Sequence, residues 1–312
     1  MGRRKHRDWK LDLEARNRVD WKGMARPLDW GAIFGRRAPL EVEVGFGNGE
    51  YLCELAEDNP QHDFVGLEVK GFRLKKALWR LERRQIENVR LMLVDARVAL
   101  QRLFRQRTIR CLHSLFCDPW PKARHEKFRL FSYEFLKLLN SRLEDGGEAF
   151  IVTDHEPFSQ WILEEASDTG LSAEHRLAAP NYGTKFERKW RMERSQERFH
   201  EIRLRKRRHL DIPVVADQPL DFPQIIHFDP QCFSPGRARG EMVVEFRKWD
   251  WKADQQRLSI LAITVDEALL QRVWMTVRRE GSQWKLELDS PEEVIPTPAV
   301  QKALELAAAA ST

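Results

Sequence analysis

Residues 40–56 of the chain have the sequence LEVEVGFGNGEYLCELA. The first five residues, Leu40–Val44, form a short apolar run of the kind found in buried strands. A glycine-rich loop, Gly45–Gly49, follows this run, and from Leu52 onward apolar residues recur at the spacing of a helix. The stretch therefore predicts a strand, a tight loop and a helix in immediate succession.

The alternation of strand and helix continues toward residue 160. Further strands are predicted at Phe64–Val69, Val89–Val94, Cys111–Cys117 and Ala149–Thr153. Helices are predicted at Gly71–Arg84, Ala96–Phe104 and Lys127–Leu143, with a turn at Gly146-Gly147 and a last helix opened by Pro157. Such alternation implies parallel strands with crossover helices. We therefore expect a doubly wound, mostly parallel α/β sheet, with its ligands beyond the carboxyl ends of the strands.

Composition divides the chain into three parts. Residues 1–38 are basic with scattered tryptophans and predict an N-terminal arm, whereas residues 39–208 hold the α/β pattern. Residues 209–312 begin with a proline-containing stretch and predict a small α+β domain of unknown role. Its expected elements are an antiparallel meander of Met242–Phe246, Leu258–Val265, Val273–Val277 and Trp284–Leu288, and a helix at Pro298–Ala310.

The composition excludes several classes of protein. No apolar run approaches the roughly 20 residues of a membrane-spanning helix, and no apolar segment of a secretory signal follows the basic N-terminus. The four cysteines form no Cys-x-x-Cys pair. Cys111, His113 and Cys117 would share one strand face, but inert thiols in a reducing compartment are favoured over a metal site. We therefore expect a cytoplasmic protein with neither a membrane segment nor a metal.

The glycine loop predicts a nucleotide-like cofactor. Gly45, Gly47 and Gly49 alternate, which allows a tight turn and a close approach to a ligand. A dinucleotide fingerprint needs glycine at the sixth position of the motif, where this chain has Glu50. Glu43 stands two residues before the first glycine, an arrangement that suits S-adenosylmethionine better, although a glycine loop alone leaves the choice open.

Two more acids follow strands at matching positions. Glu68 closes the second strand, where a carboxylate can accept both hydroxyls of a ribose. Asp95 closes the third, where it can accept an adenine amino group. Acids after strands also serve as helix N-caps, which explains any one of them. Together with Glu43 they make three acids at the ends of three consecutive strands, and this pattern favours a nucleoside site.

Asp118-Pro119-Trp120-Pro121-Lys122-Ala123-Arg124-His125 follows the fourth strand and predicts a nucleic-acid site. Its two prolines restrict the backbone. An acid beside an aromatic ring can hold a nucleobase, and Lys122, Arg124 and His125 can meet phosphate. The alternative is a surface loop in which Trp120 caps the sheet. The basic segments Lys185–Arg208 and Arg73–Arg84 could each contact RNA or be solvated charge on the surface. RNA contact is favoured for the first segment and solvated charge for the second.

The chain resembles the bacterial tRNA (guanine-N7)-methyltransferases. The matching motifs lie in the family's order over roughly residues 38–205: Glu43 to Gly49, Gly66-Leu67-Glu68-Val69, Asp95-Ala96, Asp118 to His125, Thr153-Asp154 and Thr184-Lys185-Phe186-Glu187. The combination of D-P-W-P-K-x-R-H with a later T-K-F-E is specific to this family. The resemblance implies a seven-stranded methyltransferase fold, S-adenosylmethionine as cofactor, tRNA as partner, and methylation at N7 of guanine 46 in the variable loop.

The resemblance also implies residue roles. Asp118 is the implied catalytic residue and lies where cofactor and base meet. The implied cofactor-binding residues are Glu43, Gly45, Gly47, Gly49, Glu68, Asp95 and Asp118. The implied substrate-binding residues are Lys122, Asp154, Thr184, Lys185, Phe186 and Glu187, and the implied RNA contacts are Arg124, His125, Lys127 and Arg129. Two departures stand out: Cys117 replaces the usual proline before the catalytic acid, and the second carboxylate after Asp154 is displaced to Glu156.

Three other functions remain open at this point. The D-P-W loop is similar to the D-P-P-aromatic loop of enzymes that methylate exocyclic amino groups, although Trp120 takes the place of the second proline. A non-catalytic RNA-binding protein with a nucleoside pocket is a second alternative. A dehydrogenase that uses NAD is a third, and the glycine spacing opposes it. The sequence leaves the oligomeric state and the role of the C-terminal domain undetermined.

Overall fold

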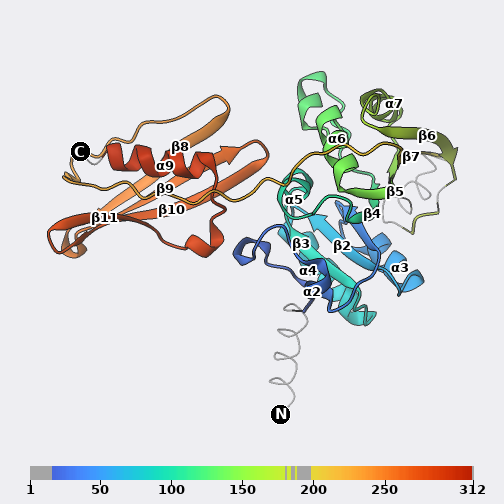
Figure 1. The fold of residues 1–312 in the computed structure, drawn as a ribbon, viewed down its shortest axis with the longest axis horizontal. Helices are drawn as coiled ribbons and strands as arrows, with labels where there is room; N and C mark the ends of the chain where they lie inside the picture. The colour runs from blue at the N-terminus through green and yellow to red at the C-terminus, as the bar shows by residue number, and fades with distance from the viewer. Residues whose placement is uncertain (1–15, 180, 184–186, 188–197, 311–312) are drawn as a thin grey trace, which may run out of the picture. The chain divides into compact units, whose positions relative to one another are not determined.

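The computed structural model describes residues 16–179, 181–183, 187 and 198–310 (Figure 1). The first fifteen residues of the predicted arm, and Thr184, Lys185 and Phe186 of the predicted substrate segment, lie outside the described residues. The chain forms two compact units: the first holds Ala25–Val215 with the residues up to Trp21, and the second holds Ala216 onward with Lys22–Met24. None of the described helices is long and apolar enough to cross a membrane.

A seven-stranded sheet organises the described part of the first unit (Figure 1). Its order is β3-β2-β1-β4-β5-β7-β6. The pairings among β1 to β5 are parallel, while β7 is antiparallel to both β5 and β6. The predicted doubly wound, mostly parallel sheet is thereby confirmed. The strands are β1 (Leu40–Val44), β2 (Asp63–Glu68), β3 (Val89–Leu93), β4 (Ile109–Leu115), β5 (Leu143–Thr153), β6 (Leu171–Ala178) and β7 (Phe199–Lys206).

The helices follow the predicted crossover pattern. They are α3 (Glu50–Asp58), α4 (Gly71–Arg83), α5 (Ala96–Arg102), α6 (Tyr133–Arg142) and α7 (Glu156–Glu165). Leu52 of α3 and Leu81 of α4 are each 1% exposed, in one cluster with Phe64 and Leu91 of the sheet. Burying a leucine side chain contributes about 2 kcal/mol.

Two local predictions were wrong. The helix expected from Lys127 begins at Tyr133, because residues Ala123–Phe128 form a 3-10 helix (η2) and Arg129 then adopts extended backbone angles. The turn expected at Gly146-Gly147 lies inside β5. Between the pairs Leu143–Ile109 and Glu148–Cys111, four residues of β5 stand opposite one of β4, so the glycines form a bulge, with Gly146 at a φ of 79°.

The described end of the predicted arm packs on the β3 side of the sheet. Val19 N donates to Leu91 O at 2.9 Å, and the Trp21 indole donates to Leu93 O at 3.3 Å. The Trp30 ring, in the short helix α2 (Trp30–Phe34), stacks on Phe104 at 4.9 Å. Residues 16–38 therefore contribute core contacts through these tryptophans.

The second unit is a four-stranded antiparallel sheet with one helix, as predicted. Its strands are β8 (Met242–Lys252), β9 (Arg257–Asp266), β10 (Leu269–Glu280) and β11 (Gln283–Leu288), in the order β11-β10-β9-β8. Helix α9 (Pro298–Ala309) buries Val300 and Leu304 in one apolar cluster with Leu258 and Val273 of the sheet. The unit thus has its own hydrophobic core.

Candidate active site

The loop after β1 requires glycine at three positions. Gly45, Gly47 and Gly49 have φ values of 74°, 58° and 73°, in the left-handed region that other residues rarely adopt. A Cβ on Gly49 would also lie 2.9 Å from the Cβ of Ala77 in α4. The loop is therefore held against α4, with backbone groups free to approach a ligand closely.

Glu43 is a buried acid that forms no ion pair with the described residues. Its side chain is at the carboxyl end of β1, the residue is 4% exposed, and its Oε2 atom has no hydrogen-bond partner among the described residues. Burial raises the pKa of Glu43 to about 8, and the nearby charge of Glu68 contributes in the same direction. An unpaired buried carboxylate is unfavourable unless a cation binds it. The ammonium group of an amino-acid moiety provides such a cation.

Glu68 is fixed at the end of β2 by the backbone around it. Its Oε1 atom accepts from Val69 N at 2.9 Å and Lys70 N at 3.1 Å. Its Oε2 atom accepts from Gly47 N and from Arg73 Nη1, both at 3.2 Å. The carboxylate thereby ties the glycine loop to the start of α4. Arg73 is the side-chain partner that a pair of ribose hydroxyls would have to replace.

Asp95 has the helix-capping role that was the alternative to cofactor binding. Its Oδ1 atom accepts from Arg97 N at 2.8 Å and caps α5. Its Oδ2 atom lies 3.4 Å from Arg97 Nη1, and the side chain is one-third exposed. Asp95 therefore lies just after β3, and one of its two carboxylate oxygens is bonded to the backbone of α5.

The loop after β4 presents Asp118 to solvent on a strained backbone. Asp118 is exposed, and the two residues Phe116 and Trp120 near it have φ values of 56° and 45°. Such conformations are unfavourable for bulky residues and cluster at functional sites. Two contacts help to maintain them: Phe116 N donates to Val152 O at 2.8 Å, and Arg129 Nε donates to Pro119 O at 3.0 Å.

Trp120 braces this loop by aromatic packing. Its ring centroid lies 5.7 Å from that of His125 and 5.4 Å from that of Phe128. Two predicted RNA contacts, Arg124 and Lys127, are exposed, as is the predicted substrate residue Lys122, whereas His125 is half-buried.

Arg129, a predicted RNA contact, differs from Arg124 and Lys127 in being buried. It is 8% exposed, and its guanidinium carbon lies 5.0 Å from the Trp161 ring centroid and 5.8 Å from that of Phe158. Because the side chain is buried and bonded to Pro119 O, it supports the Asp118 loop from beneath.

The remaining predicted site residues are only partly described. Asp154 is half-buried and directly follows β5, and Glu156 is exposed in the first turn of α7. Glu187 is buried, and its Oε2 atom accepts from Tyr182 N at 2.7 Å. Cys117 is half-buried beside Asp118, and burial raises the pKa of its thiol to about 12, so it is protonated at neutral pH.

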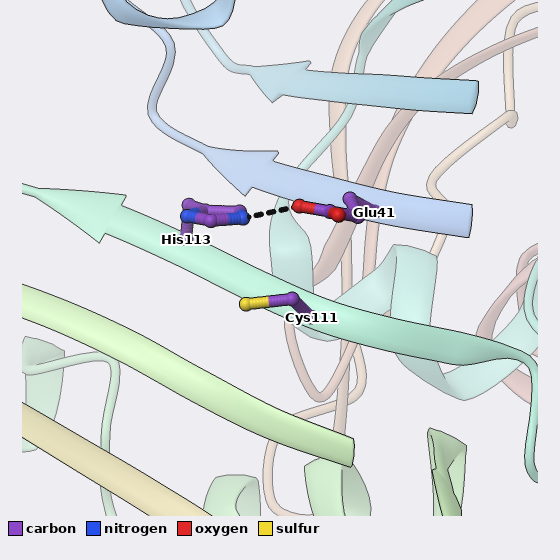
Figure 2. Close-up of side chains that lie close together, drawn as sticks. All are labelled: Glu41, Cys111 and His113. Carbon is purple, nitrogen blue, oxygen red and sulfur yellow. Dashed lines mark hydrogen bonds and ion pairs between the residues drawn. The ribbon is translucent and has the colours of Figure 1, made fainter. Parts of the chain in front are cut away.

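A buried polar cluster of Glu41, on β1, with Cys111 and His113, on β4, was not predicted (Figure 2). Glu41 Oε2 lies 2.7 Å from His113 Nε2, and Glu41 Oε1 lies 2.6 Å from His62 Nδ1. Although burial raises it, hydrogen bonds from both imidazoles leave the pKa of Glu41 below its ordinary value. Cys111 lies on the same face of β4 as His113, as its spacing predicts. The neighbouring Glu41 could be found only from the strand register.

The chain is similar to known methyltransferases over most of its length. A family model described as a putative methyltransferase matches residues 37–199. A tRNA (guanine-N(7)-)-methyltransferase of Thermotoga maritima is 32% identical over 89% of this chain and 91% of the relative. The chain belongs to the tRNA (guanine-N7)-methyltransferase family. A relative of the same name from Chlorobium phaeobacteroides is 42% identical over 55% of this chain and 84% of that protein.

The relatives differ in the share of this chain that they cover. A third relative, from Coprothermobacter proteolyticus, is 30% identical over 90% of this chain and 89% of its own length. Only about a tenth of this chain lies outside that match, whereas the second unit is nearly a third of it. Most of the second unit is therefore shared within part of the family. It is not peculiar to this protein.

The described residues fit S-adenosylmethionine. The unpaired Oε2 of Glu43 suits its ammonium group, and the glycine loop offers backbone at close approach. Glu68 offers a fixed carboxylate one strand away. These features lie at the carboxyl ends of β1 and β2, where ligands of such sheets bind.

Proposed function

We propose that this chain transfers the methyl group of S-adenosylmethionine to N7 of guanine 46 in the variable loop of tRNA, in the cytoplasm. The observation that carries the proposal is the buried, unpaired carboxylate of Glu43 beside the glycine loop, one strand from the exposed acid Asp118. The names of the relatives support tRNA as substrate and N7 of guanine as the methylated atom. Residues 39–208 would carry the reaction.

Glu43, Glu68 and the glycine loop would hold the cofactor, which supplies an electrophilic methyl group on a sulfonium. Glu43 would accept the ammonium group in its carboxylate form, and Glu68 would accept the ribose hydroxyls in place of Arg73. Asp95 would accept the adenine amino group with the oxygen that faces Arg97. Gly45, Gly47 and Gly49 would surround the amino-acid moiety.

Asp118 is the proposed catalytic residue. Guanine N7 has a free lone pair, so its methylation requires no base to remove a proton. The protein must align N7 with the methyl carbon, and such positioning can supply several kcal/mol of the barrier. The guanine ring gains positive charge as the bond forms, and the Asp118 carboxylate would stabilise that charge. Its strained loop fixes the acid before the base arrives.

Recognition of the base and of the surrounding RNA would fall to neighbouring residues. Carboxylates can accept from guanine N1 and N2, and Asp154 and Glu187 are the candidates after Asp118. Lys122, with the segment Thr184–Phe186, would complete the base pocket. Exposed Arg124 and Lys127, with His125, would contact phosphate.

The decisive experiment is incubation of the full chain with labelled S-adenosylmethionine and unmodified tRNA. Borohydride and aniline treatment then cleaves RNA at N7-methylguanine, so a single cut in the variable loop is expected. A tRNA with adenine at position 46 should give no cut. Methylation of an exocyclic amino group, seen as labelled tRNA that resists cleavage, would refute the N7 assignment. No label transfer would refute the enzymatic function.

A further inference from the structure

Helix α4 exposes aromatic and basic side chains in a single stripe. Phe72, Lys76, Trp79 and Arg83 are spaced by four, three and four residues, so they lie on one side of the helix, with Lys75 beside them. The opposite side buries Leu74, Ala77, Leu78 and Leu81. The fold is therefore secured without the stripe. We call Phe72, Lys75, Lys76, Trp79 and Arg83 the α4 stripe.

The two aromatic residues of the α4 stripe are unusually exposed. Phe72 is 60% exposed and Trp79 is 51% exposed. The solvent face of an amphipathic helix is ordinarily charged or polar. A solvated face accounts for the lysines and arginines, but it gives no reason for two large rings among them. The interpretation as solvated charge therefore leaves these two residues unexplained.

Each ring of the α4 stripe stands next to a cation. Lys76 Nζ lies 5.9 Å from the Phe72 ring centroid, and Arg83 Cζ lies 4.7 Å from that of Trp79. The acidic residue of α4, Glu82, is half-buried and lies at the edge of the stripe, seven residues after Lys75. Three cations against this one acid leave the stripe positively charged. Alternating rings and cations match unpaired nucleotides, whose bases stack on aromatic rings while their phosphates bind cations.

The α4 stripe also lies within reach of the proposed active site. α4 begins three residues after Glu68, at the carboxyl end of β2, and β2 is two strands from β4. Neighbouring strands are about 4.8 Å apart, so the ends of β2 and β4 are about 10 Å apart. The stripe from Phe72 to Arg83 extends along the helix for about 17 Å. One RNA molecule can span both.

We infer that the α4 stripe is a docking surface for RNA, and that it binds unpaired nucleotides of the tRNA whose base enters at Asp118. This inference rests on the proposed function for the identity of the RNA. Phe72 and Trp79 stack on bases, and Lys75, Lys76 and Arg83 neutralise phosphates.

Two double variants test the α4 stripe in the full chain. Phe72→Ala with Trp79→Ala should weaken tRNA binding by about 25-fold or more, because each of the two stacked bases is worth about fivefold or more. Lys76→Ala with Arg83→Ala should lower the slope of log affinity against log salt by about 2. A charge-matched control, Arg107→Ala with Arg110→Ala, removes two exposed cations at the start of β4, and the salt slope should not change.

The readouts separate this inference from the proposed function. Methylation assays should show a raised KM for tRNA with kcat little changed, and titration should show unaltered S-adenosylmethionine binding. If the wild type binds tRNA but does not methylate it, the proposed function fails. The tRNA affinities of the two double variants still test whether the α4 stripe binds RNA. Unchanged tRNA affinity and salt slope in both variants would overturn the inference. A change in self-association alone would do the same and would identify a protein interface.

Discussion

Replacing Glu43 by glutamine should stabilise the ligand-free protein and abolish binding of S-adenosylmethionine. The pKa of Glu43 is raised by burial from 4.5 to about 8. Below pH 4.5 the carboxyl is protonated in both the folded and the unfolded chain. Between pH 4.5 and 8 the unfolded chain loses this proton while the folded chain keeps it. Stability is therefore lost as the pH rises through this window.

The magnitude follows from the same two values. Each pH unit in the window lowers the free energy of unfolding by about 1.4 kcal/mol. At pH 7 the wild type should therefore have lost roughly 3 kcal/mol to this one acid. A glutamine carries no titrating proton, so the variant is free of this loss. Any difference in how the amide fits the site is a contribution that does not depend on pH.

Urea unfolding without cofactor, at pH 5 and at pH 7.5, measures the effect. The difference in unfolding free energy between the variant and the wild type should grow by roughly 3 kcal/mol between these pH values. Glu134→Gln, at an exposed acid of α6, is the matched control and should show no such growth. Parallel pH profiles for Glu43→Gln and the wild type would refute the buried, protonated carboxyl. Retained S-adenosylmethionine binding would refute its role in holding the cofactor.

Three further substitutions have expected outcomes. Asp118→Ala should lower the methylation rate by about a hundredfold or more while calorimetry shows normal cofactor binding, and near-normal turnover would remove Asp118 from the mechanism. Gly49→Ala should lower the unfolding free energy by about 2 kcal/mol or more, because of its positive φ and the contact with Ala77, and an unchanged urea midpoint would contradict this. Arg129→Ala should lower kcat by releasing Pro119, without altering the salt dependence of tRNA binding, whereas a shallower salt slope would return Arg129 to the RNA surface.

The fold was largely predictable because its strands are short apolar runs separated by amphipathic helices. The two failures have local causes. Gly146-Gly147 has the composition of a turn, yet the pair sits in a bulge that depends on the pairing of β5 with β4. The start of α6 was misplaced because Lys127 and Phe128 fit a helical pattern. The 3-10 helix ends at Phe128, and Arg129 leaves the helical region with its side chain bonded to Pro119 O, a contact that sequence periodicity does not report.

The sequence predicted which acids lie at the ends of the strands. It did not predict the hydrogen-bond partners of each acid. Asp95 combines its position at the strand end with a capping bond to Arg97 N. Arg129 belongs to a basic run in the sequence, and only packing against Trp161 and Phe158 shows that it is buried. Long-range partners of this kind decide whether a charge faces solvent, a ligand or the core.

Glu41 and Glu43 show why the bonding matters more than the residue type. The two acids alternate on β1, so they point to the same face of the sheet, and both are buried. Histidines bond both oxygens of Glu41 and keep its pKa low, whereas Glu43 keeps an unpaired oxygen and a pKa of about 8. A protein gains nothing in stability from an unpaired buried acid. The two acids therefore differ in their bonding: the scaffold satisfies both oxygens of Glu41, whereas the proposed function assigns a cationic ligand to the unpaired oxygen of Glu43.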